Sequence, residues 1–261
     1  MPLIDPARLI PLLGPLAVRF DVDALDSCDS TSDEILRRQA HGSGAGTVIV
    51  ADRQTAGRGR RGRHWQSSPE ASLTFSLLWR FADRQTPLGG LSLAVGIAVS
   101  QALEKLGAAG VRLKWPNDVL LQTPAGEGKL AGILIELSTD RRGTQAVIGI
   151  GLNLLPPRLA DRETAGLTEA LAPVPDRHVL LAALLCELQA VLDIFTVNGF
   201  AGLKPAWQER HAWQDRAVEV LGERHPVSGQ CLGVDDSGAL LIATPAGLER
   251  VLAGDVSLRT A

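Results

Sequence analysis

The sequence predicts an α+β protein, with a mixed, mostly antiparallel central sheet flanked by helices and a small β-barrel at the C-terminal end. Short apolar runs of strand length recur along the chain, separated by turn signals. A long uncharged run, Gln85 to Leu103, has the length of a helix, and after about Asp215 short alternating strands take over. A chain of 261 residues that is 45% hydrophobic can form one large domain and one small one. We therefore expect domains at 1–214 and 215–261.

The first predicted elements are a helix and two strands. Thr31 and Glu34 have the spacing of a capping box, so we expect a helix from there to about Gln39. Apolar strands are predicted at Thr47 to Asp52 and Ser72 to Trp79. The segment between them is then a loop that joins two strands.

The uncharged run and the sequence after it supply the rest of the sheet. The run is about as long as a membrane span, but it carries Thr, Pro, Ser, Gln and Gly residues, so we expect a buried helix to about Leu106. Further strands are predicted at 111–115, 129–137 and 146–154, with turns at 123–128 and 139–144. Two helices, 178–195 and 200–213, follow a proline-rich stretch.

The C-terminal segment has the pattern of a small SH3-like barrel. Its turn signals are Asp235 to Gly238 and Pro245 to Gly247. Its short strands are predicted at 217–222, 227–234, 239–244, 248–254 and 255–259.

Composition excludes several classes of protein. A net charge of -3 gives no overall attraction for nucleic acid. The three cysteines, Cys28, Cys186 and Cys231, are far apart, which argues against a disulfide framework and fits a reducing cytoplasm. The five histidines lack metal-ligand spacing, so we expect no protein-ligated transition metal. Acid and proline near the start argue against a signal peptide, and we expect no membrane association.

Four arginines occur within the seven residues GRGRRGR, Gly57 to Arg63. The stretch contains a literal G-x-G-x-x-G, but a strand follows where a dinucleotide-binding loop needs a helix. Gly126 to Leu130 resembles the end of a P-loop, yet Leu130 stands where Ser or Thr should bind magnesium. An RNA-binding tract would have repeats or interleaved aromatic residues, which GRGRRGR does not have. A solvated basic loop and a ligand clamp both remain open from this stretch alone.

Such a loop has the chemistry to hold two anions together. Glycines let its backbone close over a ligand, and guanidinium groups form paired hydrogen bonds to carboxylate and phosphate oxygens. A carboxylate and a nucleotide α-phosphate repel each other, and dense positive charge removes that barrier. The stretch is therefore suited to acyl-adenylate formation.

Five motifs in one order identify a resemblance. The chain closely resembles biotin protein ligases over about half its length, through DST (29–31), QTAGRGRRGRHW (54–65), KWPNDV (114–119), GKLAGILIE (128–136) and GIGLNL (149–154). The resemblance implies that biotin and ATP, with Mg²⁺, form biotinyl-5'-AMP, which then biotinylates a lysine of a biotin carboxyl carrier protein. It also implies the fold of class II aminoacyl-tRNA synthetases. Too few residues precede Asp29 for the winged helix of bifunctional members, so we expect a monofunctional enzyme that does not repress transcription.

The resemblance also assigns residues to biotin. Ser30, Thr31 and Gln54 match positions that bind the ureido ring and neighbouring polar atoms, although Ser30 and Thr31 also suit helix capping. The remaining residues assigned to biotin cover it, contact its carboxyl end or let it lie close to a strand: Gly57, Arg58, Arg60, Lys129 and Gly132.

The nucleotide is assigned to an overlapping set. Trp65 is able to pack against adenine, or alternatively to serve as a core tryptophan. The residues matched to ATP are Arg60, Arg63, Trp65, Asn117, Lys129 and Asn153. Asn117 and Asp118 would ordinarily form an Asx turn; by resemblance, Asp118 either ligates Mg²⁺ or accepts the attacking lysine's proton. The implied catalytic residues are Lys129, Arg60 and Asp118.

Three departures from the family pattern stand out. Ser32 replaces an asparagine, His64 replaces a lysine, and the connector 119–128 is longer than usual. Ser32 is the departure expected to shift a ligand contact. Two other functions stay open: a lipoate-type ligase and a noncatalytic nucleic-acid-binding protein that uses Arg58 to Arg63. A homodimer formed by edge-to-edge sheet pairing is a further expectation.

Overall fold

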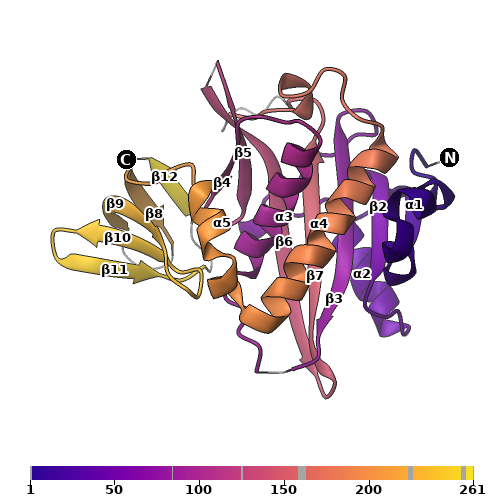
Figure 1. Cartoon of the computed structure of the whole chain (residues 1–261), viewed down its shortest axis with the longest axis horizontal. Helices are drawn as coiled ribbons and strands as arrows, with labels where there is room; N and C mark the ends of the chain where they lie inside the picture. The colour runs from indigo at the N-terminus through magenta and orange to yellow at the C-terminus, as the bar shows by residue number, and fades with distance from the viewer. Residues whose placement is uncertain are drawn as a thin grey trace.

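The computed structural model describes residues 2–83, 85–124, 126–157, 163–222, 226–253 and 257–260. A seven-stranded sheet has the order β1-β2-β3-β7-β6-β5-β4, in which β1 and β2 are parallel and the other neighbours antiparallel. Its strands are β1 (Asp21–Cys28), β2 (Thr47–Gln54), β3 (Ser72–Phe81), β4 (Val111–Lys114), β5 (Asp118–Thr123), β6 (Gly126–Asp140) and β7 (Gly143–Asn153). The predicted mixed, mostly antiparallel sheet is confirmed (Figure 1).

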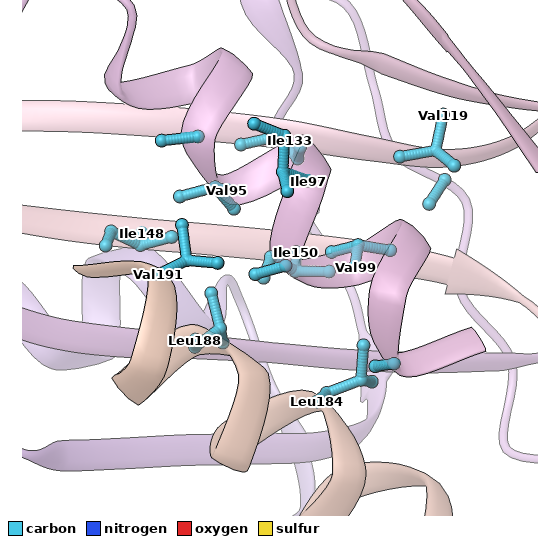
Figure 2. Packing of buried hydrophobic residues seen from close by; sticks show 14 of the residues in the cluster. Val95, Ile97, Val99, Val119, Ile133, Ile148, Ile150, Leu184, Leu188 and Val191 are labelled. Atoms are coloured by element: carbon cyan, nitrogen blue, oxygen red, sulfur yellow. The ribbon is translucent and has the colours of Figure 1, made fainter. Parts of the chain in front are cut away.

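Helices α3 (Leu91–Lys105) and α4 (Arg177–Asn198) lie side by side across one face of the sheet (Figure 1). Alternate residues of each strand point to this face, because side chains alternate along a strand. Figure 2 shows the resulting core, with helix residues packed on strand residues. The labelled members are Val95, Ile97, Val99, Val119, Ile133, Ile148, Ile150, Leu184, Leu188 and Val191.

Helix α2 (Thr31–Ala40) covers part of the opposite face. A smaller apolar cluster of Ile35, Ile49, Leu78 and Val147 joins this helix to strands β2, β3 and β7. Toward the other end of these strands the same face carries glycine, serine and threonine. The small side chains leave room there for a cavity.

The C-terminal strands, predicted as a small SH3-like barrel, form an antiparallel sheet that is not closed in the described residues. The strands are β8 (Ala217–Leu221), β9 (Val227–Val234), β10 (Leu240–Thr244), β11 (Gly247–Val251) and β12 (Ser257–Thr260). Their order is β11-β10-β9-β8-β12, so β11 and β12 are the two edges and do not pair with each other. Parts of the predicted strands 248–254 and 255–259 lie outside the described residues.

Two predicted helix starts are corrected. Ser30, not Thr31, caps α2, because the Ser30 side chain accepts a hydrogen bond from the Asp33 amide. The uncharged run becomes helical only at Leu91, after the left-handed Gly90. The predicted helix at 200–213 is shorter, with a 3₁₀ turn at Phe200–Gly202 followed by α5 (Lys204–Glu209).

Three elements were not predicted from the sequence. Helix α1 (Pro6–Leu13) packs on α4, and the acidic strand β1 forms an edge of the sheet. Strand β5 occupies the first half of the expected connector and pairs with both β4 and β6.

Helix α4 is the one helix in the described part of the chain that is long and apolar enough to cross a membrane by length and composition. It packs on α3 and on α1, and eleven of its residues are buried. We interpret α4 as a core helix.

Candidate active site

A row of paired residues crosses the sheet on the α2 face. Strand register makes each member the direct neighbour of the next, so their side chains share one face. From β4 to β2 the row is Lys114, Asp118, Gly132, Gly151, Thr74 and Ala51. Charged residues therefore stand at one end of a trough with a floor of small residues.

A cavity of about 530 Å³ lies over this trough. It is bounded by the sheet, by the start of α2 and by the arginine loop, residues 57–65, which connects β2 toward β3. Of the residues predicted for the site, the cavity lining includes Ser30, Thr31, Gln54, Arg58, Arg60, Arg63, Trp65, Asn117, Asp118, Lys129 and Gly132. The fold thus brings together motifs that lie up to about a hundred residues apart in the sequence.

Lys129 and Asp118 form the charged centre of the cavity. Lys129 Nζ lies 2.5 Å from Asp118 Oδ1, and both side chains are mostly buried, with 18% and 22% exposed. The same ammonium lies 5.9 Å from the centroid of the Trp65 ring, within range of a cation–π interaction. Lys129 is therefore held at the boundary between the trough floor and the arginine loop.

Trp65 lies across the glycine pair at the centre of the trough. A Cβ on Gly151 would overlap the indole ring, and a Cβ on Gly132 would lie 3.2 Å from Trp65 Cζ3. Only glycine lets the ring approach the two strands so closely. Trp65 Nε1 is buried and has no acceptor among the described residues, so it is able to donate to a ligand.

The arginine loop is folded down onto the protein. Arg58 forms a two-pronged contact with Glu136 at 2.9 and 2.6 Å and a second ion pair with Asp33 at 2.7 Å. Arg60 Nη1 donates to Asn117 Oδ1 at 3.1 Å. Arg58 thus ties the loop to α2 and β6, while Arg60 reaches across the cavity to the Asn117–Asp118 corner.

The inner end of the cavity is polar and rigid. Gln54 Oε1 accepts hydrogen bonds from the amide and the hydroxyl of Thr31, at 2.8 and 3.1 Å. Asp29 accepts from the Ser30 amide, and its pKa is lowered to about 2 because Arg37 donates to it. These contacts hold the first turn of α2 against the end of β2.

Two predicted residues lie outside the cavity lining. Gly57 is buried next to it, where a Cβ would meet the Trp65 carbonyl and Gln54. Asn153 is 4% exposed, and its Nδ2 donates to the Lys129 and Ala165 carbonyls. Its contact with nucleotide stays a prediction, whereas its observed contacts brace the strand that carries Lys129.

Comparisons with known proteins identify the family of this chain. Residues 25–153 match the Biotin/lipoate A/B protein ligase family, and residues 215–259 match the Biotin protein ligase C terminal domain. The chain is 36% identical over 252 residues to the biotin--[acetyl-CoA-carboxylase] ligase of Mycobacterium tuberculosis, covering 94% of this chain and 91% of that protein. The chain belongs to the biotin protein ligase family.

Other members of the biotin protein ligase family extend the match. The bifunctional ligase/repressor BirA of Escherichia coli is 37% identical over 245 residues, covering 92% of this chain and 74% of that protein. The biotin protein ligase from Aquifex aeolicus, solved in complex with biotin and ATP, superposes with a TM-score of 0.80 at 33% identity. That match covers 92% of this chain and 99% of the Aquifex chain.

The structure of this biotin ligase family member adds cavity residues that the sequence analysis did not select. Lys114 lies 4.0 Å from the centroid of the Trp213 ring, and its burial lowers its pKa. Trp213 Nε1 donates to Glu127 Oε1 at 2.7 Å. Arg259 of β12 also lines the cavity. Lys114 stands in the motif KWPNDV and could have been found there; no local pattern marks Arg259.

Proposed function

We propose that this chain joins biotin to ATP as biotinyl-5'-AMP and transfers the biotinyl group to a lysine of a biotin carboxyl carrier protein. The observation that carries the proposal is the glycine-floored cavity, in which Arg60 contacts Asn117 and Lys129 contacts the adjacent Asp118. The small residues of the trough floor leave room for a slender acyl chain beside the Trp65 ring. Its carboxylate would then meet the nucleotide at the cationic end.

The residues act by neutralising charge and fixing position. In the first step a biotin carboxylate oxygen attacks the α-phosphorus and pyrophosphate leaves, so negative charge accumulates between two anions. Lys129 and Arg60 both line the cavity and would offset that charge, because fixed charges in a partly buried site interact strongly with developing charge. Arg63 and Trp65 line the same space and are assigned to the nucleotide.

In the second step the acceptor lysine's amine attacks the acyl carbonyl, and AMP leaves. The attacking amine must lose a proton. Asp118, which pairs with Lys129 in the cavity, is the residue that would either take that proton or help to hold Mg²⁺. Mg²⁺ typically uses one or two protein carboxylates together with substrate phosphates, and Asp118 is a carboxylate that could serve in this way.

Replacing Asp118 by Asn separates the two roles. If the carboxylate holds Mg²⁺, the D118N variant needs more Mg²⁺ to form the adenylate. If it accepts the proton, adenylate formation keeps its Mg²⁺ dependence, and transfer of a preformed adenylate slows. Single-turnover assays of each step at several Mg²⁺ concentrations distinguish these results.

Lipoate is the second candidate substrate, because the matching family includes lipoate ligases. The match of residues 215–259 to a biotin ligase C-terminal domain favours biotin. Exchange of labelled pyrophosphate into ATP tests the choice: we expect exchange with biotin and none above background with lipoate. Exchange with lipoate alone would overturn the proposal.

Three further expectations remain proposals. The reaction would take place in the cytoplasm, the acceptor would be a carrier domain rather than nucleic acid, and two copies would pair through sheet edges. Transfer of labelled biotin to an isolated carrier domain tests the acceptor. Sedimentation with and without biotin and ATP tests the dimer.

A further inference from the structure

Three buried hydroxyl groups form a chain behind the inner end of the cavity. Thr31, Ser32 and Ser76 are 3%, 4% and 0% exposed. The Ser76 oxygen lies 2.7 Å from the Thr31 hydroxyl and 3.0 Å from the Ser32 hydroxyl. The Thr31 hydroxyl donates in turn to Gln54 Oε1, at 3.1 Å. The chain therefore runs from Ser32 through Ser76 and Thr31 to Gln54.

Counting protons gives this chain one direction. Each hydroxyl has a single proton, whereas the carbonyl oxygen of Gln54 has none and must accept. Thr31 therefore donates to Gln54, Ser76 to Thr31, and Ser32 to Ser76. All three contacts form together only in this arrangement. The proton of Ser32 is then directed inward, and its free lone pairs make it a hydrogen-bond acceptor.

The two ends of the chain present opposite chemistry to the cavity. Ser32 and Gln54 both line it. Because Gln54 Oε1 is taken by Thr31, the Nε2 donor is the other half of that amide, and it lies beside Gly57. The inner end thus pairs an acceptor with a donor. A cyclic urea has the complementary pair, a ring N–H and a carbonyl oxygen.

Packing keeps Ser32 in this position. Ser76 and Gly149 are direct partners in the β3–β7 ladder, and a Cβ on Gly149 would lie 2.8 Å from Ser32 Oγ. The glycine thus makes the space in which the Ser32 hydroxyl reaches Ser76.

We propose that Ser76, which lies behind the cavity wall, is a positioning residue that fixes Ser32 as an acceptor and so selects substrates whose ring carries an N–H. The proposal rests on the proposed biotin activation. Without the Ser76 hydroxyl, the Ser32 proton loses its partner and is free to turn toward the ligand. An acceptor facing a ligand N–H would then become a donor.

Ser76→Ala and Ser32→Ala, singly and together, test this idea by pyrophosphate exchange. We expect S76A to raise the KM for biotin on the order of tenfold, since a hydrogen bond of this kind contributes about that factor. The kcat and the KM for ATP should stay within about twofold. Ser100→Ala is the matched control, because Ser100 is also fully buried and its hydroxyl donates to the Ile97 carbonyl within α3.

The double variant separates a relay from a general packing effect. If Ser76 acts through Ser32, adding S76A to S32A changes the biotin KM by less than about threefold, because coupled residues are not additive. An equal rise of the biotin KM in both backgrounds, an equal rise of the ATP KM, or no change in S76A would each overturn the inference.

Should S76A fail to fold, S32A alone carries the test: it must bind biotin and an analogue methylated at the ureido nitrogens equally, while the wild-type protein prefers biotin. Loss of exchange in the wild-type protein would instead reject the proposed function.

Discussion

Lys129 is the side chain whose removal should affect the chemistry most. It lies 2.5 Å from Asp118 and next to the Trp65 ring. We expect Lys129→Gln to slow adenylate formation by about a hundredfold or more, since a fixed charge directed at a reacting phosphate contributes on this scale. Biotin-dependent pyrophosphate exchange measures the loss. The thermal midpoint should change little by comparison.

Lys105→Gln is the matched control for this substitution. Lys105 also pairs with a carboxylate, Glu187, but on the far side of the sheet at the end of α3. Its substitution should leave exchange at the wild-type rate. Equal rates for K129Q and the wild-type protein would remove Lys129 from the mechanism.

At the residue scale, sequence motifs located most of the cavity lining, because the five motifs resemble those of biotin protein ligases. Ser76 was missed because it stands inside an apolar strand. The neighbouring sequence does not distinguish a serine that only packs from one that joins a hydrogen-bond chain. Asn153 was assigned to nucleotide by resemblance, and that assignment stays a prediction; the structure adds that its Nδ2 donates to two backbone carbonyls. A sequence names residue types but does not show where side chains point.

The glycine-floored trough is an element-scale feature that depends on the register of β6 and β7. Gly151→Ala would place a methyl group against the Trp65 indole and displace it. We expect at least a tenfold loss of kcat/KM with folding retained. Gly44→Ala is the control, because no atom lies within 4 Å of the position a Cβ would take. In a protein that already carries W65A, adding G151A should lower kcat/KM little further. If G151A lowers kcat/KM as much as it does in the wild-type protein, Gly151 does not act through Trp65.

The Arg58 ion pairs hold the arginine loop to α2 and β6. Replacing Asp33 and Glu136 together by Asn and Gln removes both carboxylates. Amide hydrogen exchange at residues 57–65 should then become at least several-fold faster, because the loop's contacts with the scaffold are weakened. Glu187→Gln, at a distant exposed ion pair, should leave these amides unchanged. Unchanged exchange in the double variant would mean that the loop's own hydrogen bonds, such as Gly59 to Arg63, hold it closed.

At the element scale, apolar periodicity predicted β2, β3, β6 and β7 within about three residues of their observed ends, whereas α3 begins later in the uncharged run, at Leu91. Strand β1 was missed because an edge strand needs few apolar residues, and its acids protect an exposed edge. Strand β5 was missed because the turn signals of Asn117 and Asp118 hide a strand that begins at Asp118. The predicted barrel is an open sheet in the described residues, since closure depends on long-range pairing.

The whole molecule includes a buried histidine between its two sheets. His211 stacks on Trp207 of α5, and its Nε2 lies 3.9 Å from Cys231 of β9. Burial lowers the pKa of His211 to about 4, against the smaller opposing effects of Gln214 and Asp215. The unfolded chain therefore binds more protons than the folded one between about pH 6.5 and pH 4.

Stability should consequently fall as the pH drops through this window and be fully present above it. From pH 7 to pH 5 the loss attributable to His211 is roughly 2 kcal/mol. Urea unfolding of the wild-type protein and of the His211→Gln variant at pH 7 and pH 5 measures this loss of stability. The free energy of unfolding of the variant should fall by less than that of the wild-type protein. His41→Gln, at an exposed histidine, should retain the wild-type dependence. An H211Q variant with the full wild-type loss would assign the effect to other groups.

At the scale of the whole molecule, the sequence predicted a separate C-terminal segment but did not predict that this segment lines the cavity. Leu258 and Arg259 of β12 line the same cavity as the arginine loop, about two hundred residues away in the chain. The C-terminal sheet reaches the cavity because it packs against the main domain. One contact between them is the hydrogen bond from Trp115 Nε1, next to β4, to the Gly238 carbonyl, between β9 and β10. The domain division at 215 remains a prediction.

The central claim is that one cavity brings biotin and ATP together and joins them. The most direct measurement is to incubate the full chain with biotin, ATP and Mg²⁺, remove small molecules by gel filtration, and identify what stays bound by mass spectrometry. The account predicts biotinyl-5'-AMP near one equivalent per chain for the wild-type protein and far less for K129Q. Retention of biotin or ATP unchanged, with no adenylate formed, would contradict it.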